Sequence, residues 1–192
     1  MRKLFPLASL LFALPLAACF DAEMTLNFPD ENTAEATMVM IASADFYEMA
    51  ATGGEAFCAE GVEVEMEDGS YSCTETFTGT IDEAVADPNI SEGMTIERRG
   101  GGLLFVSFDL EEVTSDMAPP EEAGGDEMLA MMAEALAGHA ITLNIGGSEI
   151  VETNGTVSAD GKTATFAIPL DGMVTGADEL PASFDVLVRP GT

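Results

Sequence analysis

The sequence predicts an α+β fold in which an antiparallel sheet of seven to ten strands packs with two or three helices. Three observations support this. Short segments with period-two alternation of apolar and polar residues recur along the chain, whereas only three segments have helical character. Asp-Gly, Asn-Gly and Gly-rich turn signals separate neighbouring strand segments, which favours hairpins. We find no internal repeat, so the pattern indicates one irregular sheet-based unit rather than a repeat array.

The predicted strands follow one another closely. In order, they span residues 24–28, 36–42, 62–66, 70–77, 94–99, 103–110, 139–145, 149–153, 163–168 and 183–189. The first two flank the turn sequence PDENT and form a hairpin. Asp68-Gly69 and the glycines at 100–102 mark two further hairpins. Asn154-Gly155 and Asp160-Gly161 mark turns between the last strands.

One strand is apolar on both faces. Leu104, Val106 and Phe108 share one face by period two, and Leu103 and Phe105 lie on the other. A strand with two apolar faces is covered on both sides, so we expect it near the centre of the sheet.

The predicted helices span residues 44–52, 81–87 and 127–137. Ser43 can cap the first helix, and the glycines at 53 and 54 end it. Gly138 ends the last helix in the same way.

The first nineteen residues resemble the leader of a bacterial lipoprotein. Arg2 and Lys3 are basic, and residues 4–18 form an apolar run too short to span a bilayer. The run ends in LAAC, which resembles a lipobox. The resemblance implies that residues 1–18 are a signal peptide, that Cys19 carries lipid and that residues 19–22 form an acylated tether. An ordinary secretory signal with an incidental Cys19 is the alternative. By analogy with enteric sorting, Phe20 rather than Asp after the cysteine favours the outer membrane.

The remaining residues, 23–192, are expected to form one periplasmic domain. The chain has 35 acidic residues and six Lys or Arg, for a net charge of −29, and loss of Arg2 and Lys3 makes it about −31. Because phosphate neutralisation needs Lys and Arg, this charge argues against nucleic acid as a partner. It also argues against electrostatic docking on anionic lipid headgroups. The membrane is then a partner through the N-terminal lipid alone.

The three cysteines are expected to have two roles, lipid attachment and a disulfide. If Cys19 carries lipid, Cys58 and Cys73 remain as an even pair in an oxidising compartment, so we predict a disulfide between them. A metal-binding pair is the alternative, but no histidine lies nearby in the sequence.

The sequence gives no support for catalysis, and we expect no cofactor. It has one histidine, His139, at a predicted helix-to-strand junction, and no G-x-S-x-G elbow. One histidine cannot supply the usual zinc-hydrolase ligand sets. No pair of acids stands out for glycoside hydrolysis, and Trp is absent.

Methionines gather in the third predicted helix. Met128 and Met131 or Met132 share a face because they are three or four residues apart. Packing of this face on the sheet is the plain interpretation. A speculative one is an apolar ligand site between helix and sheet, formed by the residues Leu104, Val106, Phe108, Met128, Met131 and Met132. The alternative hypothesis is a periplasmic copper site of thioethers and imidazole, formed by Met117, Met128, Met131, Met132 and His139.

The C-terminal segment 141–170, ITLNIGGSEIVETNGTVSADGKTATFAIPL, resembles the corresponding part of LppM-type lipoproteins. The hairpin after Cys19, MTLNFPDENTAEATMVM, resembles their start. The resemblance implies a lipid-anchored α+β domain with a curved sheet and a lipid-accommodating cavity, in a family connected with envelope glycolipids and without catalytic residues. This chain departs from that pattern in its two further cysteines and in lacking the hydrophobic C-terminal span of many members. We therefore expect a non-enzymatic envelope protein that binds an apolar or lipid ligand. Copper binding, or a structural role in an envelope complex with unknown protein partners, remains open.

Overall fold

The computed structural model describes residues 20–53, 56–59, 61–87, 93–111, 126–175 and 180–192. The described strands are β1 (Phe20–Asn27), β2 (Thr33–Ala42), β3 (Val62–Glu65), β4 (Tyr71–Thr80), β5 (Met94–Arg99), β6 (Leu103–Asp109), β7 (Ala140–Gly146), β8 (Glu149–Thr153), β9 (Thr156–Val157), β10 (Thr163–Pro169) and β11 (Ser183–Arg189). The described helices are α1 (Ala44–Gly53), α2 (Ile81–Ala86), α5 (Asp126–Leu136) and α6 (Leu170–Thr175). The α+β class is confirmed, with more strands and helices than predicted.

The described strands form two sheets rather than one, which corrects the sequence prediction. The larger sheet has the order β3-β4-β2-β1-β7-β10-β9, and the smaller has the order β5-β6-β11-β8. The expectation of a wholly antiparallel sheet is also wrong, because β1 pairs with β7 in parallel. All other described pairs are antiparallel. Hairpin signals report only on strands that are neighbours along the chain, so they could not reveal this long-range pair.

The two sheets pack face to face around a common core. Phe184 of β11 stacks on Phe108 in its own sheet at 6.2 Å and on Phe166 of β10 in the other sheet at 5.5 Å. The buried faces alternate with period two, as predicted. From the large sheet they include Leu26, Phe28, Leu143, Ile145 and Ile168, and from the small sheet Leu104, Val106, Phe108, Phe184, Val186 and Val188. The apolar strand faces are thus covered by another sheet rather than by a helix.

The chain passes between the sheets at Asn154-Gly155. β8 belongs to the small sheet and β9 to the large one, and only these two residues separate them. A Cβ on Gly155 would lie 2.6 Å from Cε2 of Phe184 and 2.7 Å from the carbonyl oxygen of Thr165. Glycine is therefore required for this close approach, so the predicted turn is a two-residue crossing between the two sheets.

The helices at 44–52, 81–87 and 127–137 are confirmed as α1, α2 and α5. The backbone N–H of Phe46 donates to the Ser43 hydroxyl at 3.3 Å, as the predicted cap requires. The short helix α6 was not predicted. Its sequence LDGMVT contains a glycine and lacks a helical pattern, so contact with α5 and β10 decides its conformation.

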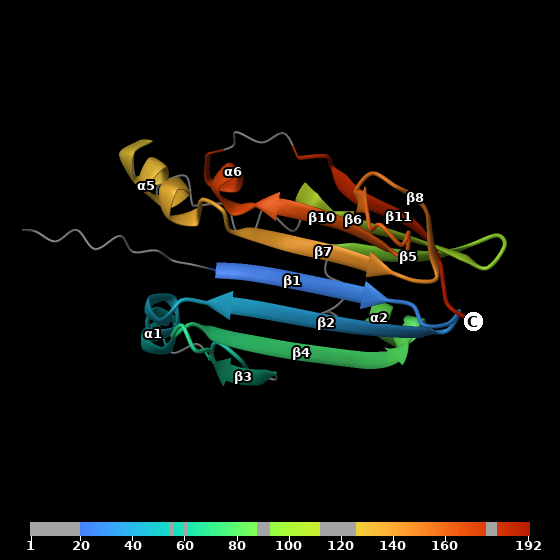
Figure 1. Ribbon diagram of the computed structural model, residues 1–192, viewed down its shortest axis with the longest axis horizontal. Coiled ribbons are helices and arrows are strands. Elements are labelled where there is room, and N and C mark those ends of the chain that lie inside the picture. Colours follow the sequence, from blue (N-terminus) through green and yellow to red (C-terminus); the bar gives the residue numbers. More distant parts are fainter. Residues whose placement is uncertain (1–19, 54–55, 60, 88–92, 112–125, 176–179) are drawn as a thin grey trace, which may run out of the picture.

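The molecule has two unlike ends, which Figure 1 shows at left and right. We call the first the Phe20 end: β1 begins there, and α1 and α5 lie beside it. We call the second the hairpin end: it carries the turns at 29–32, 100–102 and 158–161 and the C-terminus. Among the described residues, no helix is long and apolar enough to cross a membrane.

Candidate functional site

A hollow of about 510 Å³ lies on the outer face of the small sheet. Its lining residues come from all four strands and the turn after β8: Arg99, Leu103, Phe105, Glu152, Thr153, Asn154, Asp185, Val186 and Leu187. The volume falls in the range of roughly 300–1,000 Å³ that ligand sites occupy. The hollow is thus large enough for part of a lipid or another small amphiphile.

Apolar side chains form the floor of the hollow. Phe105 and Leu187 are register partners on β6 and β11, and Leu103 lies two residues along the same face of β6. All three are half-buried, although they point away from the core. These are the residues of the second apolar face that the sequence displayed. Half-buried apolar surface on an outer sheet face is available to a ligand.

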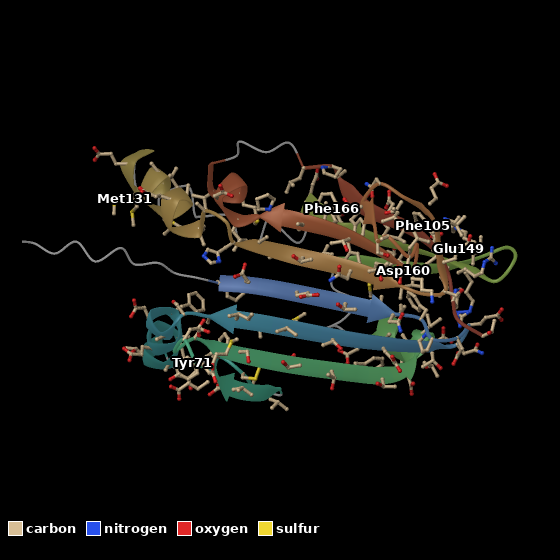
Figure 2. All side chains as sticks on the ribbon, in the orientation of Figure 1. Tyr71, Phe105, Met131, Glu149, Asp160 and Phe166 are labelled. Atoms are coloured by element: carbon tan, nitrogen blue, oxygen red, sulfur yellow. A yellow bond between two sulfur atoms is a disulfide. The ribbon has the colours of Figure 1, made fainter. Side chains whose placement is uncertain are left out.

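Arg99 borders this floor. Its guanidinium carbon lies 5.0 Å from the centre of the Phe105 ring, a distance typical of cation–π contact. Arg99 also forms an ion pair with Glu97. Figure 2 shows Phe105 and Glu149 near the hairpin end. This border therefore offers a positive charge that is already oriented by an aromatic ring.

A hydrogen-bond network forms the other border. Asp185 Oδ1 accepts from the Ser107 hydroxyl at 2.7 Å, and Asp185 Oδ2 accepts from the Ser183 hydroxyl at 3.0 Å. The Asp185 backbone N–H donates to Asn154 Oδ1 at 2.8 Å, and the Asp185 carbonyl accepts from the Thr153 hydroxyl at 2.7 Å. Two hydroxyl groups hold the carboxylate in place, so it forms a border of fixed geometry.

The hollow combines three chemical features in one place. It has an apolar floor, a positive charge at Arg99, and carboxylates at Asp185 and Glu152. Such a surface matches an amphiphile whose headgroup carries both signs of charge. Sequence reasoning missed the site because it predicted the hairpin that carries Arg99 but not the pairing of β11 with β6 and β8, which brings Asp185 and Glu152 beside it.

The disulfide prediction is confirmed. Cys58 and Cys73 are bonded, with their Cα atoms 5.4 Å apart and a sequence separation of 15. Cys73 is fully buried on β4, and Cys58 lies in the segment between α1 and β3. The bond joins the second strand of the β3–β4 hairpin to the segment before its first strand, as predicted.

The structure does not bring the predicted ligand residues together. Leu104, Val106 and Phe108 are buried in the core between the sheets. Met128 and Met131 are 53% and 71% exposed on α5, whereas Met132 is half-buried. The alternation of the strand was interpreted correctly, but its inward face meets the large sheet instead of α5.

Among the residues of the alternative copper hypothesis, His139 is paired with an acidic side chain. His139 is 19% exposed, and its Nδ1 lies 2.9 Å from Asp21 Oδ2. Asp21 Oδ1 accepts the backbone N–H of Ala140 at 3.0 Å, so His139 and its neighbour join the starts of β1 and β7. In the part of the chain that the structure describes, no three His, Cys, Asp or Glu side chains gather as metal ligands.

Two predicted residues, Cys19 and Met117, lie outside the described residues. The expected tether differs from the structure: residues 20–22 are the first residues of β1 and pair with 40–42 of β2. Their alternation continues that of 24–28, and pairing with β2 extends the strand back to Phe20.

Comparison with known proteins finds a structure with a similar fold. No family model matches the sequence, and no curated protein matches it. Among solved structures, the chain is similar to one folded protein domain. That structure is the NMR structure of the folded domain of the Mycobacterium tuberculosis LppM protein. The TM-score is 0.50 with 10% identity, and the match covers 91% of this chain and 92% of that one. At this identity the likeness establishes the fold alone.

Proposed function

We propose that the protein is a lipid-anchored envelope lipoprotein whose domain binds an amphiphilic, lipid-like ligand without catalysing a reaction. The anchor is supported by the leader, in which LAAC is followed directly by the first strand of the domain. The fold is supported by its likeness to the LppM domain. The main support for ligand binding is the hollow on the small sheet, with its apolar floor and its two charged borders.

The floor of the hollow supplies the affinity in this proposal. Covering apolar surface contributes about 25 cal/mol per Å², counted on both the floor and the acyl chain that covers it. Arg99 would face the phosphate of a zwitterionic headgroup, and Asp185 and Glu152 would face its ammonium group. The hollow would therefore orient the ligand as well as hold it.

Lysophosphatidylcholine, added below its micelle concentration, is a direct probe. The Cys19→Ala form of the chain removes the competing anchor, and native mass spectrometry counts bound lipid on it. We expect saturable binding of one lipid. Leu103→Gln with Leu187→Gln makes the floor polar and should abolish this binding.

Val157→Gln is the matched control, because Val157 is an exposed apolar strand residue of the large sheet. It should leave binding unchanged. Saturable binding that survives in the Leu103 and Leu187 double variant would place the lipid elsewhere. If the Cys19→Ala chain with an unchanged hollow shows no saturable binding of lysophosphatidylcholine, the ligand proposal fails.

A further inference from the structure

We propose that the Phe20 end of the domain lies against the bilayer that the Cys19 lipid enters, and that Met128 and Met131 of α5 insert among its lipids. This inference rests on the proposed acylation of Cys19. It goes further by assigning a protein surface to the membrane and a fixed orientation to the domain.

The first step is the position of the anchor. Phe20 is already in β1 and pairs with Ala42 of β2, and two residues later Ala22 pairs with both β2 and β7. Consecutive Cα atoms are about 3.8 Å apart, so Cys19 has no slack between it and the sheet. A lipid on Cys19 therefore brings the start of β1 to the surface of the bilayer.

The second step is the position of α5. The backbone N–H of His139 donates to the carbonyl of Leu136, the last residue of the helix, at 3.0 Å. His139 and Ala140 in turn contact Asp21, the neighbour of Phe20. Figure 1 shows α5 beyond the start of β7, at the same end as the start of β1. Contacts of adjoining residues thus tie α5 to the end that would carry the anchor.

The third step is the chemistry of the helix face. Leu129, Met132 and Leu136 are half-buried, and their spacing places them on the side of α5 that packs on the protein. Met128 and Met131 are exposed instead, and Met131 points away from the domain in Figure 2. Methionine is flexible and apolar, so it adapts to irregular surfaces such as lipid chains. Two adjacent exposed methionines on one helix are explained if a bilayer covers them.

The fourth step is charge. The four Lys and Arg outside the leader are Arg98, Arg99, Lys162 and Arg189. Strand pairing places them all at the hairpin end: Arg99 is opposite Leu103, Lys162 precedes β10, and Arg189 is opposite Glu149. The Phe20 end instead exposes the acids Asp45 and Glu48 of α1 and Glu127 and Glu134 of α5. Glu127 and Glu134 are four and three residues from Met131, so they share its side of α5 and would stay at the headgroups while the methionines enter the lipid. Anionic lipids should therefore weaken the insertion.

The chain contains no tryptophan, so a single indole can report on this surface. The experiment uses the full acylated chain with Met131→Trp, reconstituted in phosphatidylcholine vesicles that contain lipid brominated on its acyl chains. We expect bromine to quench the fluorescence at least twofold. Val157→Trp at the hairpin end is the matched control, because Val157 is also exposed, and it should not be quenched. Added phosphatidylglycerol should reduce the quenching at Met131→Trp.

Intact mass of the same sample separates the two proposals. Diacylglyceryl on Cys19 with quenching at Met131→Trp alone supports the inference. Lipid on Cys19 without quenching at Met131→Trp, or with equal quenching at both sites, overturns the inference and leaves the anchor standing. Absence of lipid on Cys19 overturns the anchor and with it this orientation.

Discussion

The two ends of the molecule are closed by different means. At the Phe20 end, α1 and α5 cover strand ends, Phe46 of α1 lies 5.5 Å from Phe20, and the Cys58–Cys73 bond fixes the edge of the sheet. At the hairpin end, tight turns join the strands, and short side chains satisfy the turn backbone. Asp30 accepts from the backbone N–H groups of Asn32 and Thr33 at 2.8 and 2.9 Å.

This difference indicates which end of the molecule can adjust its conformation to its surroundings. Tight turns with their own hydrogen bonds are specified locally, so the hairpin end keeps its geometry independently of its surroundings. The Phe20 end depends on helix packing and on one covalent bond, and it exposes apolar side chains of α5. A surface of that kind suits contact with a membrane. The hairpin end, whose turns are specified locally, suits a hollow of defined shape.

Removing the covalent bond should have the largest effect, and it should be confined to the Phe20 end. The Cys58→Ala, Cys73→Ala double variant loses the constraint on a loop of 15 residues, which is worth about 3 kcal/mol. Urea unfolding measures the loss. Amide hydrogen exchange should accelerate in α1, β3 and the first half of β4, and remain unchanged in the second half of β4 near Thr80. Equal acceleration in both halves of β4 would show that the ends are not distinct.

Loss of a helix cap at the hairpin end should have a smaller effect. The Glu83 backbone N–H donates to the Thr80 hydroxyl, and the Thr80 backbone N–H donates to the Glu83 carboxylate at 2.8 Å, forming a capping box at the start of α2. Thr80→Ala should lower the free energy of unfolding by about 1 kcal/mol. Thr78→Ala, an exposed change on the same strand, is the control. Similar losses in both variants would argue that the cap is unimportant.

The smallest effect should come from a turn carboxylate and should depend on pH. The Ser158 hydroxyl, and then the Lys162 backbone N–H, hold the pKa of Asp160 below its usual value. A lowered folded-state pKa stabilises the protein above the unfolded-state pKa, and this contribution is lost as pH falls through the folded-state pKa. Asp160→Asn should therefore be less stable than the wild type at neutral pH, and the gap should close in acid. Glu35→Gln is the control for loss of one charge; a gap that widens in acid would contradict the assignment.

The local structure could be predicted from the sequence because its signals are local. Asp68-Gly69 closes the β3–β4 hairpin, with Gly69 at a φ of 85°, and Ser43 caps α1. The pairing of β1 with β7 could not be predicted, because no turn joins them. The division into two sheets was missed for a related reason: Leu104, Val106 and Phe108 show that a face is buried, but not what covers it.

The candidate site was likewise predictable only where the sequence signal was local. The sequence indicated a second apolar face at Leu103 and Phe105, and this face forms the floor of the hollow. It could not indicate Asp185, which reaches the hollow because β11 pairs with β6. The disulfide was predictable because only two cysteines remained once Cys19 was assigned to lipid.

The place of β1 between β2 and β7 also determines how the domain would resist mechanical force. A pull on a membrane anchor at Cys19 acts along the axis of β1, and eight residue pairs with β2 and six with β7 lie parallel to that axis. Hydrogen bonds perpendicular to the pull are loaded together in shear rather than opened one by one. If Cys19 carries a lipid anchor, the strand next to the anchor is the one that pairs on both sides, so a pull on the anchor would be distributed over β2 and β7.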